Sequence, residues 1–348
     1  MAFFIGTVSG LGMGLWLALN DNASAILDPY IKALNSMPRV ILAPIFAVWF
    51  GLGVWSKVAL GVTLVFFIVF FPVSYWLWNK SILARAGVVI FFSVFFNVWL
   101  KNLFEIPRPL IEHLVMVEVG DWSFPSGHAQ YSTVVWGWLA YELKQLAVNQ
   151  SRPVGKTDLI NLSKFVYPIA AAIILAIGFS RIYLGVHYPV DVLAGIFIGL
   201  LTLFGYCFAT TAKHTKWNAL APAMQSVILF VSIMCFFLVP HALTGAEIKG
   251  AGVFFGFATA VLYEKRYVNF DYRRKQSTAT DMKSLAGIIT LGYVGLLVIW
   301  IGLKALFSTV SLIPEVADFV RYMLLGLWVG FIAPYGFCRL GWRTRAVG

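Results

Sequence analysis

The chain has 348 residues, of which 60% are hydrophobic and only 12% are charged. Soluble domains carry about 25% charged residues, so the composition excludes an ordinary soluble protein and predicts an all-α, polytopic integral membrane protein. The net charge of +11 raises nucleic acid as a partner, but the positions of the basic residues explain it differently below. Three cysteines lie in or beside apolar segments without disulfide or metal-ligand spacing, which predicts small buried side chains.

Apolar runs long enough to span, or nearly span, a bilayer recur along the whole chain. They lie near residues 3–20, 38–54, 57–78, 86–104, 128–147, 165–182, 190–212, 219–240, 250–264, 284–305 and 319–338. Several are shorter than the roughly 20 residues of a straight span, so we expect about 9–11 transmembrane helices.

Lysine and arginine are distributed unevenly between alternate loops. If the C-terminal tail is cytoplasmic, the loops on that side hold most of the basic residues, with the largest group at 264–283. The positive-inside rule selects this orientation. The net charge therefore indicates topology and no nucleic-acid partner. We expect residues 264–283 to form a solvated cytoplasmic loop, with binding to anionic lipid headgroups as the alternative.

Three short polar patches interrupt the apolar runs between residues 101 and 191. Their patterns are Lys101-x6-Arg108-Pro, Pro125-Ser126-Gly127-His128 and Ser180-Arg181-x5-His187-x3-Asp191. The predicted orientation puts all three on the outer face of the membrane. Three cations suit phosphoryl transfer, in which negative charge spreads over several oxygen atoms.

Each patch also has an ordinary structural interpretation. Lys101 could extend toward the interface from a helix end, Arg108 could anchor at the interface, and Ser126 could be a helix N-cap. Against this, a helix start at Ser126 and Gly127 forms an anion site from free backbone N–H groups.

The histidines divide into two groups. His187 and Asp191 are four residues apart where a helix begins, so a carboxylate can lie beside an imidazole and orient it. His128 falls in the second patch. The other three, His113, His214 and His241, match no pattern and are interpreted as structural.

Four acidic residues, Glu105, Glu112, Glu118 and Asp121, lie between the first two patches. Their spacing is irregular and no set of His or Cys accompanies them, so we expect neither a metal nor a cofactor. The aromatic residues Trp122 and Phe124 are predicted at the membrane interface, at the mouth of the site.

Together and in this order, the three patches resemble the signature of the type 2 phosphatidic acid phosphatase family. The resemblance is continuous over about residues 72–212 and extends to the C-terminus. It implies that His187 is the nucleophile that forms a phosphohistidine, that Asp191 orients it and that His128 is the general acid. It also implies phosphate binding by Lys101, Arg108, Ser126, Gly127 and Arg181, without a metal.

Residues 1–71 resemble a different kind of protein. The segment from Leu27 to Lys57 is similar to part of an ABC-importer permease of the nitrate, sulfonate and taurine type. It stops before the loop that docks the ATPase, so no ABC ATPase subunit is expected. We therefore predict a permease-like fragment at 1–71, a phosphatase core at 72–212 and an extension of about four helices at 213–348.

The expected function is hydrolysis of a lipid phosphate or lipid diphosphate at the outer face of a bacterial inner membrane, with the C-terminus in the cytoplasm. Phosphatidic acid, phosphatidylglycerol phosphate and undecaprenyl diphosphate all fit as substrates. Two alternatives stay open: a transport-related membrane protein with a vestigial site, and a phosphotransferase that uses the same phosphohistidine.

Overall fold

The computed structural model describes residues 69–109, 121–149, 164–183, 185–211, 217, 219–272, 279–310 and 313–345, with positions 12 and 16. These residues are helical apart from turns and one isolated β-bridge between Phe270 and Arg345. The all-α prediction is confirmed. The permease-like segment lies almost wholly outside the described residues.

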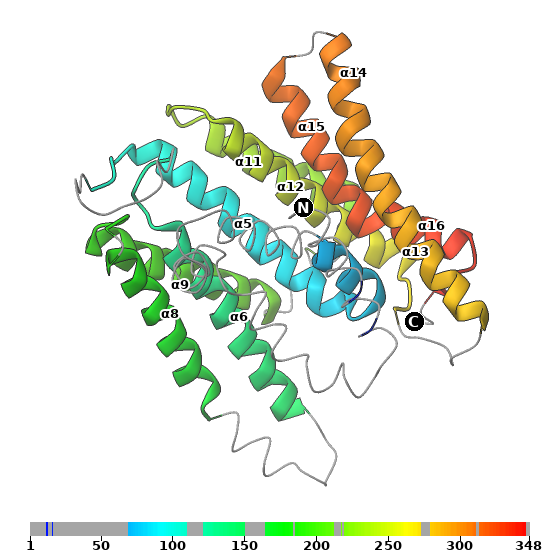
Figure 1. Ribbon diagram of the computed structural model, residues 1–348, viewed down its shortest axis with the longest axis horizontal. Helices are drawn as coiled ribbons and strands as arrows, with labels where there is room; N and C mark the ends of the chain where they lie inside the picture. The colour runs from blue at the N-terminus through cyan, green and yellow to red at the C-terminus, as the bar shows by residue number, and fades with distance from the viewer. Residues whose placement is uncertain are drawn as a thin grey trace. The chain divides into compact units, whose positions relative to one another are not determined.

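The chain divides into two compact units, here described separately. Unit 1 includes residues 96–212 and therefore all three polar patches. It contains the C-terminal part of α5 (Lys80–Phe104), α6 (Gly127–Asn149), α8 (Val166–Tyr183) and α9 (Pro189–Thr211). Within it, α6 packs against both α8 and α9 (Figure 1).

Glycines allow α9 to approach the start of α6 closely. A Cβ atom at Gly195 would lie 2.5 Å from the carbonyl oxygen of Ser126, and one at Gly199 would lie 2.7 Å from Cβ of Thr133. Any larger residue would push the helices apart. This close packing holds the start of α6 beside the start of α9, where the second and third patches lie.

Unit 2 includes residues 65–95 and 213–348. Its described helices after the N-terminal part of α5 are α11 (Pro222–Phe237), α12 (Gly245–Tyr263), α13 (Ala279–Leu297), α14 (Leu303–Thr309), α15 (Pro314–Leu327) and α16 (Ala333–Arg339). Three π-helical turns, η1 (Glu264–Val268), η2 (Val298–Gly302) and η3 (Trp328–Ile332), continue α12, α13 and α15. The helices α12 and α15 pack along each other (Figure 1).

The core of unit 2 is rich in buried aromatic residues. Trp76 is fully buried and donates to the carbonyl oxygen of Val329 over 2.8 Å. Phe257 lies against Tyr75 and Phe71 in edge-to-face geometry, with ring centroids 5.7 and 5.6 Å apart. Such pairs add to the stabilisation that burial provides.

The prediction of a solvated loop from residue 264 is wrong at its first residue. Glu264 is buried, and its Oε1 accepts from Nζ of Lys80 and from the backbone N–H of Phe270, both over 2.9 Å. The reason is that η1 prolongs α12 and turns Glu264 toward Lys80, a partly buried cation. Residues 273–278 of the predicted loop lie outside the described residues.

Six of the described helical stretches are long and apolar enough to cross a membrane. They are Lys80–Phe104, Val166–Tyr183, Pro189–Ala209, Gly245–Val268, Met282–Thr309 and Pro314–Arg339. Every apolar run predicted from residue 86 onward coincides with a helix. The helix α11 is shorter, and α6, predicted as a crossing, is less apolar. The chain is a multi-pass membrane protein.

Candidate active site

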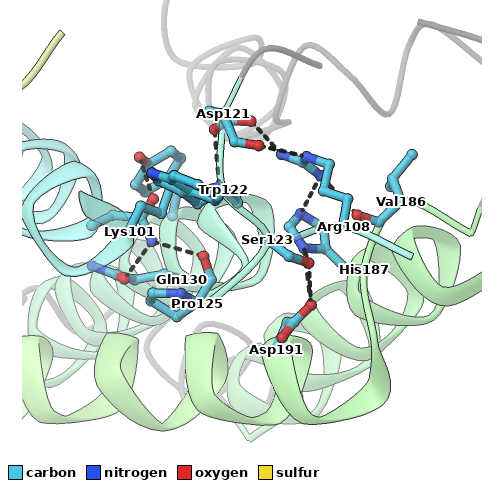
Figure 2. Close-up of polar contacts among 12 residues, drawn as sticks. Lys101, Arg108, Asp121, Trp122, Ser123, Pro125, Gln130, Val186, His187 and Asp191 are labelled. Atoms are coloured by element: carbon cyan, nitrogen blue, oxygen red, sulfur yellow. Dashed lines mark hydrogen bonds and ion pairs between the residues drawn. The ribbon is translucent and has the colours of Figure 1, made fainter. Parts of the chain in front are cut away.

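The three polar patches lie at helix ends within unit 1. Lys101 is in the last turn of α5 and Arg181 in the last turn of α8, while Asp191 is in the first turn of α9. His187 lies in the turn between α8 and α9, after Gly185, whose φ of 65° suits glycine. Figure 2 shows side chains from the first and third patches beside residues 121–123.

The imidazole of His187 is buried, with contacts on both ring nitrogens. Nη1 of Arg108 lies 3.3 Å from Nε2, and Oγ of Ser123 lies 3.2 Å from Nδ1 (Figure 2). Burial, then the charges of Arg108, Lys101 and His128, lower the pKa of His187 to about 2. The ring is therefore neutral at physiological pH, as a nucleophile must be.

Asp191 is fully buried beside this histidine. Its Oδ2 lies 3.4 Å from Nδ1 of His187, and it accepts from Oγ of Ser123 and from the backbone N–H of Tyr188, the latter over 2.8 Å. The carbonyl oxygen of Asp191 accepts from the N–H of Ser126 over 3.0 Å. The second and third patches are thus joined by a direct backbone hydrogen bond.

Arg108 is held on the segment that follows α5. Its Nη1 donates to the carbonyl oxygen of Val186 over 2.7 Å, and its Nε donates to that of Asp121 over 3.0 Å. The guanidinium therefore reaches from the first patch to the turn that carries His187.

Asp121 lies between two of the predicted phosphate-binding cations. Its Oδ2 is 2.9 Å from Nζ of Lys101, and its Oδ1 accepts from Nη2 of Arg108 (Figure 2). Burial acts to raise the pKa of Asp121, but the charges of Lys101 and Arg108 outweigh it and the pKa lies below its usual value. A carboxylate, half exposed, thus lies where two cations converge.

The remaining predicted residues lie at the starts and ends of the same helices. Ser126 is buried just before α6, and His128 is in the first turn of α6, close enough to His187 for its charge to act there. A Cβ at Gly127 would lie 2.8 Å from Oδ1 of Asn97, so glycine allows α5 and α6 to meet.

Arg181 is fully buried, and its Nε and Nη2 both donate to Oγ of Ser180 over 3.1 Å.

Comparison with known proteins gives the family. Residues 82–218 match the model of the PAP2 superfamily, and residues 248–345 match that of the PAP2 superfamily phosphatase, transmembrane extension. The chain belongs to the PAP2 superfamily. The resemblance to type 2 phosphatidic acid phosphatases is confirmed, in the core and in the C-terminal extension.

Individual relatives are similar over parts of their length. Phosphatidylglycerophosphatase B of Bacillus subtilis is 38% identical over 31% of this chain and 48% of its own length. Lipid phosphate phosphatase delta of Arabidopsis thaliana is 20% identical over 83% of this chain and 71% of its own length. A crystal structure of a transmembrane PAP2-type phosphatidylglycerolphosphate phosphatase from Bacillus subtilis covers 60% of this chain and 98% of that chain, with 28% identity and a TM-score of 0.35.

The chain is also similar to a transport permease, the kind of protein that residues 1–71 resemble. The formylaminopyrimidine transport permease protein ThiX of Halalkalibacterium halodurans is 38% identical over 18% of this chain and 25% of its own length. The match is short, and the division of the chain at residue 71 stays a prediction.

Sequence reasoning missed two residues of this PAP2 site. Ser123 was not singled out, although its position between Trp122 and Phe124 is a weak signal for a buried hydroxyl. Asp121 was considered only as a member of a loose acidic group. The aromatic residue Phe124 packs edge-to-face on Phe104, with ring centroids 5.1 Å apart.

The four acidic residues between the first two patches differ in their surroundings. Among the residues that the structure describes, no group of three or more His, Cys, Asp or Glu could hold a metal ion. Glu105 is exposed with a φ of 49°, and Asp121 pairs with cations. Glu112 and Glu118, with His113 and His214, lie outside the described residues.

A polar network lies beside the site in the interior of unit 1. Nδ2 of Asn97 donates to Oε1 of Gln130 over 2.9 Å, and its Oδ1 accepts from the hydroxyl of Tyr131 over 3.0 Å. Because buried amides are costly unless paired, this network fixes α5 against the first turn of α6.

Proposed function

We propose that this protein is a phosphatase that hydrolyses a lipid phosphate or lipid diphosphate through a phosphohistidine at His187, without a metal ion. The observation that carries the proposal is the neutral, buried imidazole of His187, held between Arg108 and the Ser123–Asp191 pair. Its superfamily and the names of its relatives support a phosphoric ester hydrolase.

The cations bind the phosphate. Arg108 and Lys101 already hold a carboxylate, that of Asp121, and a phosphoryl group can replace it with more charge and more acceptor oxygens. Arg181, Ser126 and the backbone at Gly127 are the further proposed phosphate contacts. These groups stabilise the negative charge that spreads over the equatorial oxygens during transfer.

The nucleophile is Nε2 of His187. A guanidinium can only donate hydrogen bonds, so the contact with Arg108 requires a lone pair on Nε2 and leaves the proton on Nδ1. The lone pair attacks phosphorus as the bond to the leaving oxygen breaks. Burial and the charges of Arg181, Lys101 and Arg108 lower the pKa of His128 to about 3, so His128 gains a proton only when the negative charge of a bound phosphate offsets these cations. His128 then protonates the leaving oxygen and later takes a proton from the water that hydrolyses the phosphohistidine.

The surroundings of the site favour an amphiphilic substrate. The last turn of α8, which holds Arg181, and the first turns of α9, which hold Asp191, carry exposed apolar side chains: Phe179 is 67% exposed, Tyr183 74% and Leu193 66%. In a membrane these side chains face acyl chains, so a lipid tail can stay in the bilayer while its headgroup reaches the cations. Phosphatidic acid, phosphatidylglycerol phosphate and undecaprenyl diphosphate share this chemistry.

The proposed location is a bacterial inner membrane with the site on the outer face and the C-terminus in the cytoplasm. The support is the excess of lysine and arginine in the loops on the opposite side, as the positive-inside rule requires.

The test is phosphate release by the detergent-solubilised protein from phosphatidic acid and undecaprenyl diphosphate, with EDTA present. We expect release that survives EDTA and is lost in His187→Ala. The matched control is His241→Gln, since His241 is a buried histidine of unit 2 that pairs with Glu247 over 3.0 Å and belongs to none of the patches.

No release by a folded wild-type protein would overturn the hydrolase. Release only when a second acceptor is added would indicate the phosphotransferase instead. Activity that persists in His187→Ala would show that another residue is the nucleophile.

A further inference from the structure

The contact between His187 and Asp191 is less direct than their spacing suggests. The distance between Nδ1 and Oδ2 is 3.4 Å, longer than the 3.2 Å between Nδ1 and Oγ of Ser123. The hydroxyl of Ser123 is close to both groups: Oγ is 3.2 Å from Nδ1 and donates to Oδ2 over 2.5 Å. Ser123 lies beside both partners (Figure 2).

The direction of these hydrogen bonds follows from donor capacity. The carboxylate of Asp191 can only accept, so the hydroxyl proton of Ser123 points to Oδ2. Because Arg108 can only donate to Nε2, the single proton of the neutral ring is on Nδ1 and points to Oγ. The imidazole therefore donates from Nδ1–H to Oγ of Ser123, and the hydroxyl of Ser123 donates in turn to Asp191.

The backbone holds Ser123 in this position. Its N–H donates to the carbonyl oxygen of Ile106 over 2.8 Å, in the same segment that presents Arg108. The segment with Ile106 and Arg108 is thus paired with the segment that holds Ser123. Together they contact both ring nitrogens of His187: Arg108 lies at Nε2 and Ser123 at Nδ1. The side chain of Ser123 is fully buried, so water does not compete for the hydroxyl.

We propose that Ser123 is a positioning residue that couples Asp191 to His187. Its hydroxyl accepts the hydrogen bond from Nδ1–H, while Arg108 faces the lone pair of Nε2 on the other side of the ring. The hydroxyl also passes the negative potential of Asp191 to the ring, which stabilises the positive charge that the ring gains when Nε2 bonds to phosphorus. This rests on the proposed phosphohistidine function.

The test compares Ser123→Ala with Ser123→Thr and with Ser132→Ala. Ser132 is an equally buried serine in α6 whose hydroxyl donates to the carbonyl oxygen of Ala129 over 3.0 Å, outside the site. Removing a hydrogen bond to a charged group predicts a kcat for Ser123→Ala roughly 10- to 100-fold below wild type. KM stays unchanged, since the phosphate-binding cations remain.

Two further readouts distinguish positioning from a loss of packing. Ser123→Thr restores a large part of kcat because it keeps the hydroxyl, and Ser132→Ala keeps the wild-type kcat. In NMR of ¹⁵N-histidine-labelled protein, His187 shows a proton on Nδ1 in both proteins because Arg108 remains, but the Nδ1–H proton signal moves upfield in Ser123→Ala, which lacks its hydroxyl acceptor.

A wild-type kcat in Ser123→Ala, with His187→Ala inactive, would overturn the coupling and leave the phosphatase intact. An unchanged Nδ1–H signal in Ser123→Ala would also overturn it. An inactive wild-type protein would instead refute the proposed function. Equal losses in Ser123→Ala and Ser132→Ala would reduce Ser123 to a packing role.

Discussion

Each unit of this protein contains a carboxylate held between a lysine and an arginine. In unit 1, Asp121 pairs with Lys101 and Arg108. In unit 2, Asp318 pairs with Lys249 over 3.4 Å and with Arg321 over 2.5 Å. By charge alone the two clusters are alike.

Their surroundings differ. Beside Asp121 lie a buried neutral histidine, a serine and a carboxylate in contact with one another, together with the start of α6. The cluster at Asp318 lies along α12 and α15, and its Arg321 is over the ring of Tyr322, 5.3 Å from the centroid. On the proposed function, only the cations beside the histidine and its partners act in catalysis. The following predictions test this comparison.

The largest expected effect is at Arg108. Replacing it by alanine removes a charge-assisted donor to the transferring phosphoryl group and a contact with Nε2 of His187. We expect kcat/KM to fall by about 10²–10³-fold, as for the loss of an oxyanion donor. Steady-state kinetics with phosphatidic acid measure this, and Arg321→Ala is the matched control, expected to keep wild-type kcat/KM. Equal losses of kcat/KM in Arg108→Ala and Arg321→Ala would show that the two clusters do not differ in catalysis.

A second effect concerns the pH dependence of thermal stability. The folded protein holds the pKa of His187 at about 2, whereas an unfolded histidine titrates near pH 6.5. Between these values the unfolded chain binds an extra proton, so stability falls as pH falls below about 6.5. His187→Asn removes this proton uptake. Between pH 7 and pH 5 the Tm of His187→Asn should therefore fall a few degrees less than the Tm of the wild type. Parallel Tm curves would mean that His187 is not held neutral by the fold.

The smallest expected effect is at Asp121. Its carboxylate is 51% exposed and competes with an anion for Lys101 and Arg108. Asp121→Asn weakens this competition, so orthovanadate should inhibit at roughly two- to tenfold lower concentration, a range set by the modest strength of exposed ion pairs. Asp318→Asn removes the matching carboxylate of unit 2 and should leave vanadate inhibition unchanged. Weaker inhibition in Asp121→Asn would instead make Asp121 a support for the two cations.

Much of this architecture can be predicted from the sequence, because it depends on local patterns. Apolar runs predict the helices, since a bilayer requires backbone hydrogen bonds to be satisfied within each segment. The spacing of His187 and Asp191 places them on one side of a helix start. Lys101 and Arg108 are identified because they fall in the three-patch signature, whose order and spacing are visible in the sequence.

The parts that could not be predicted depend on contacts between distant segments. The role of Ser123 arises from its backbone pairing with Ile106 and its approach to the α8–α9 turn. The burial of Glu264 follows from a π-helical turn that brings it to Lys80. Neither contact leaves a periodic trace in the sequence, and small polar residues and loop carboxylates are usually exposed.

The central claim is that His187 carries the phosphoryl group during turnover. The most direct measurement is rapid acid-free denaturation of the protein in sodium dodecyl sulfate during hydrolysis of ³²P-labelled phosphatidic acid, followed by detection of label on the chain. The account predicts a phosphoprotein that is stable in alkali, labile in acid and absent from His187→Asn. Equal labelling of His187→Asn, or turnover with no labelled protein at any time, would contradict it.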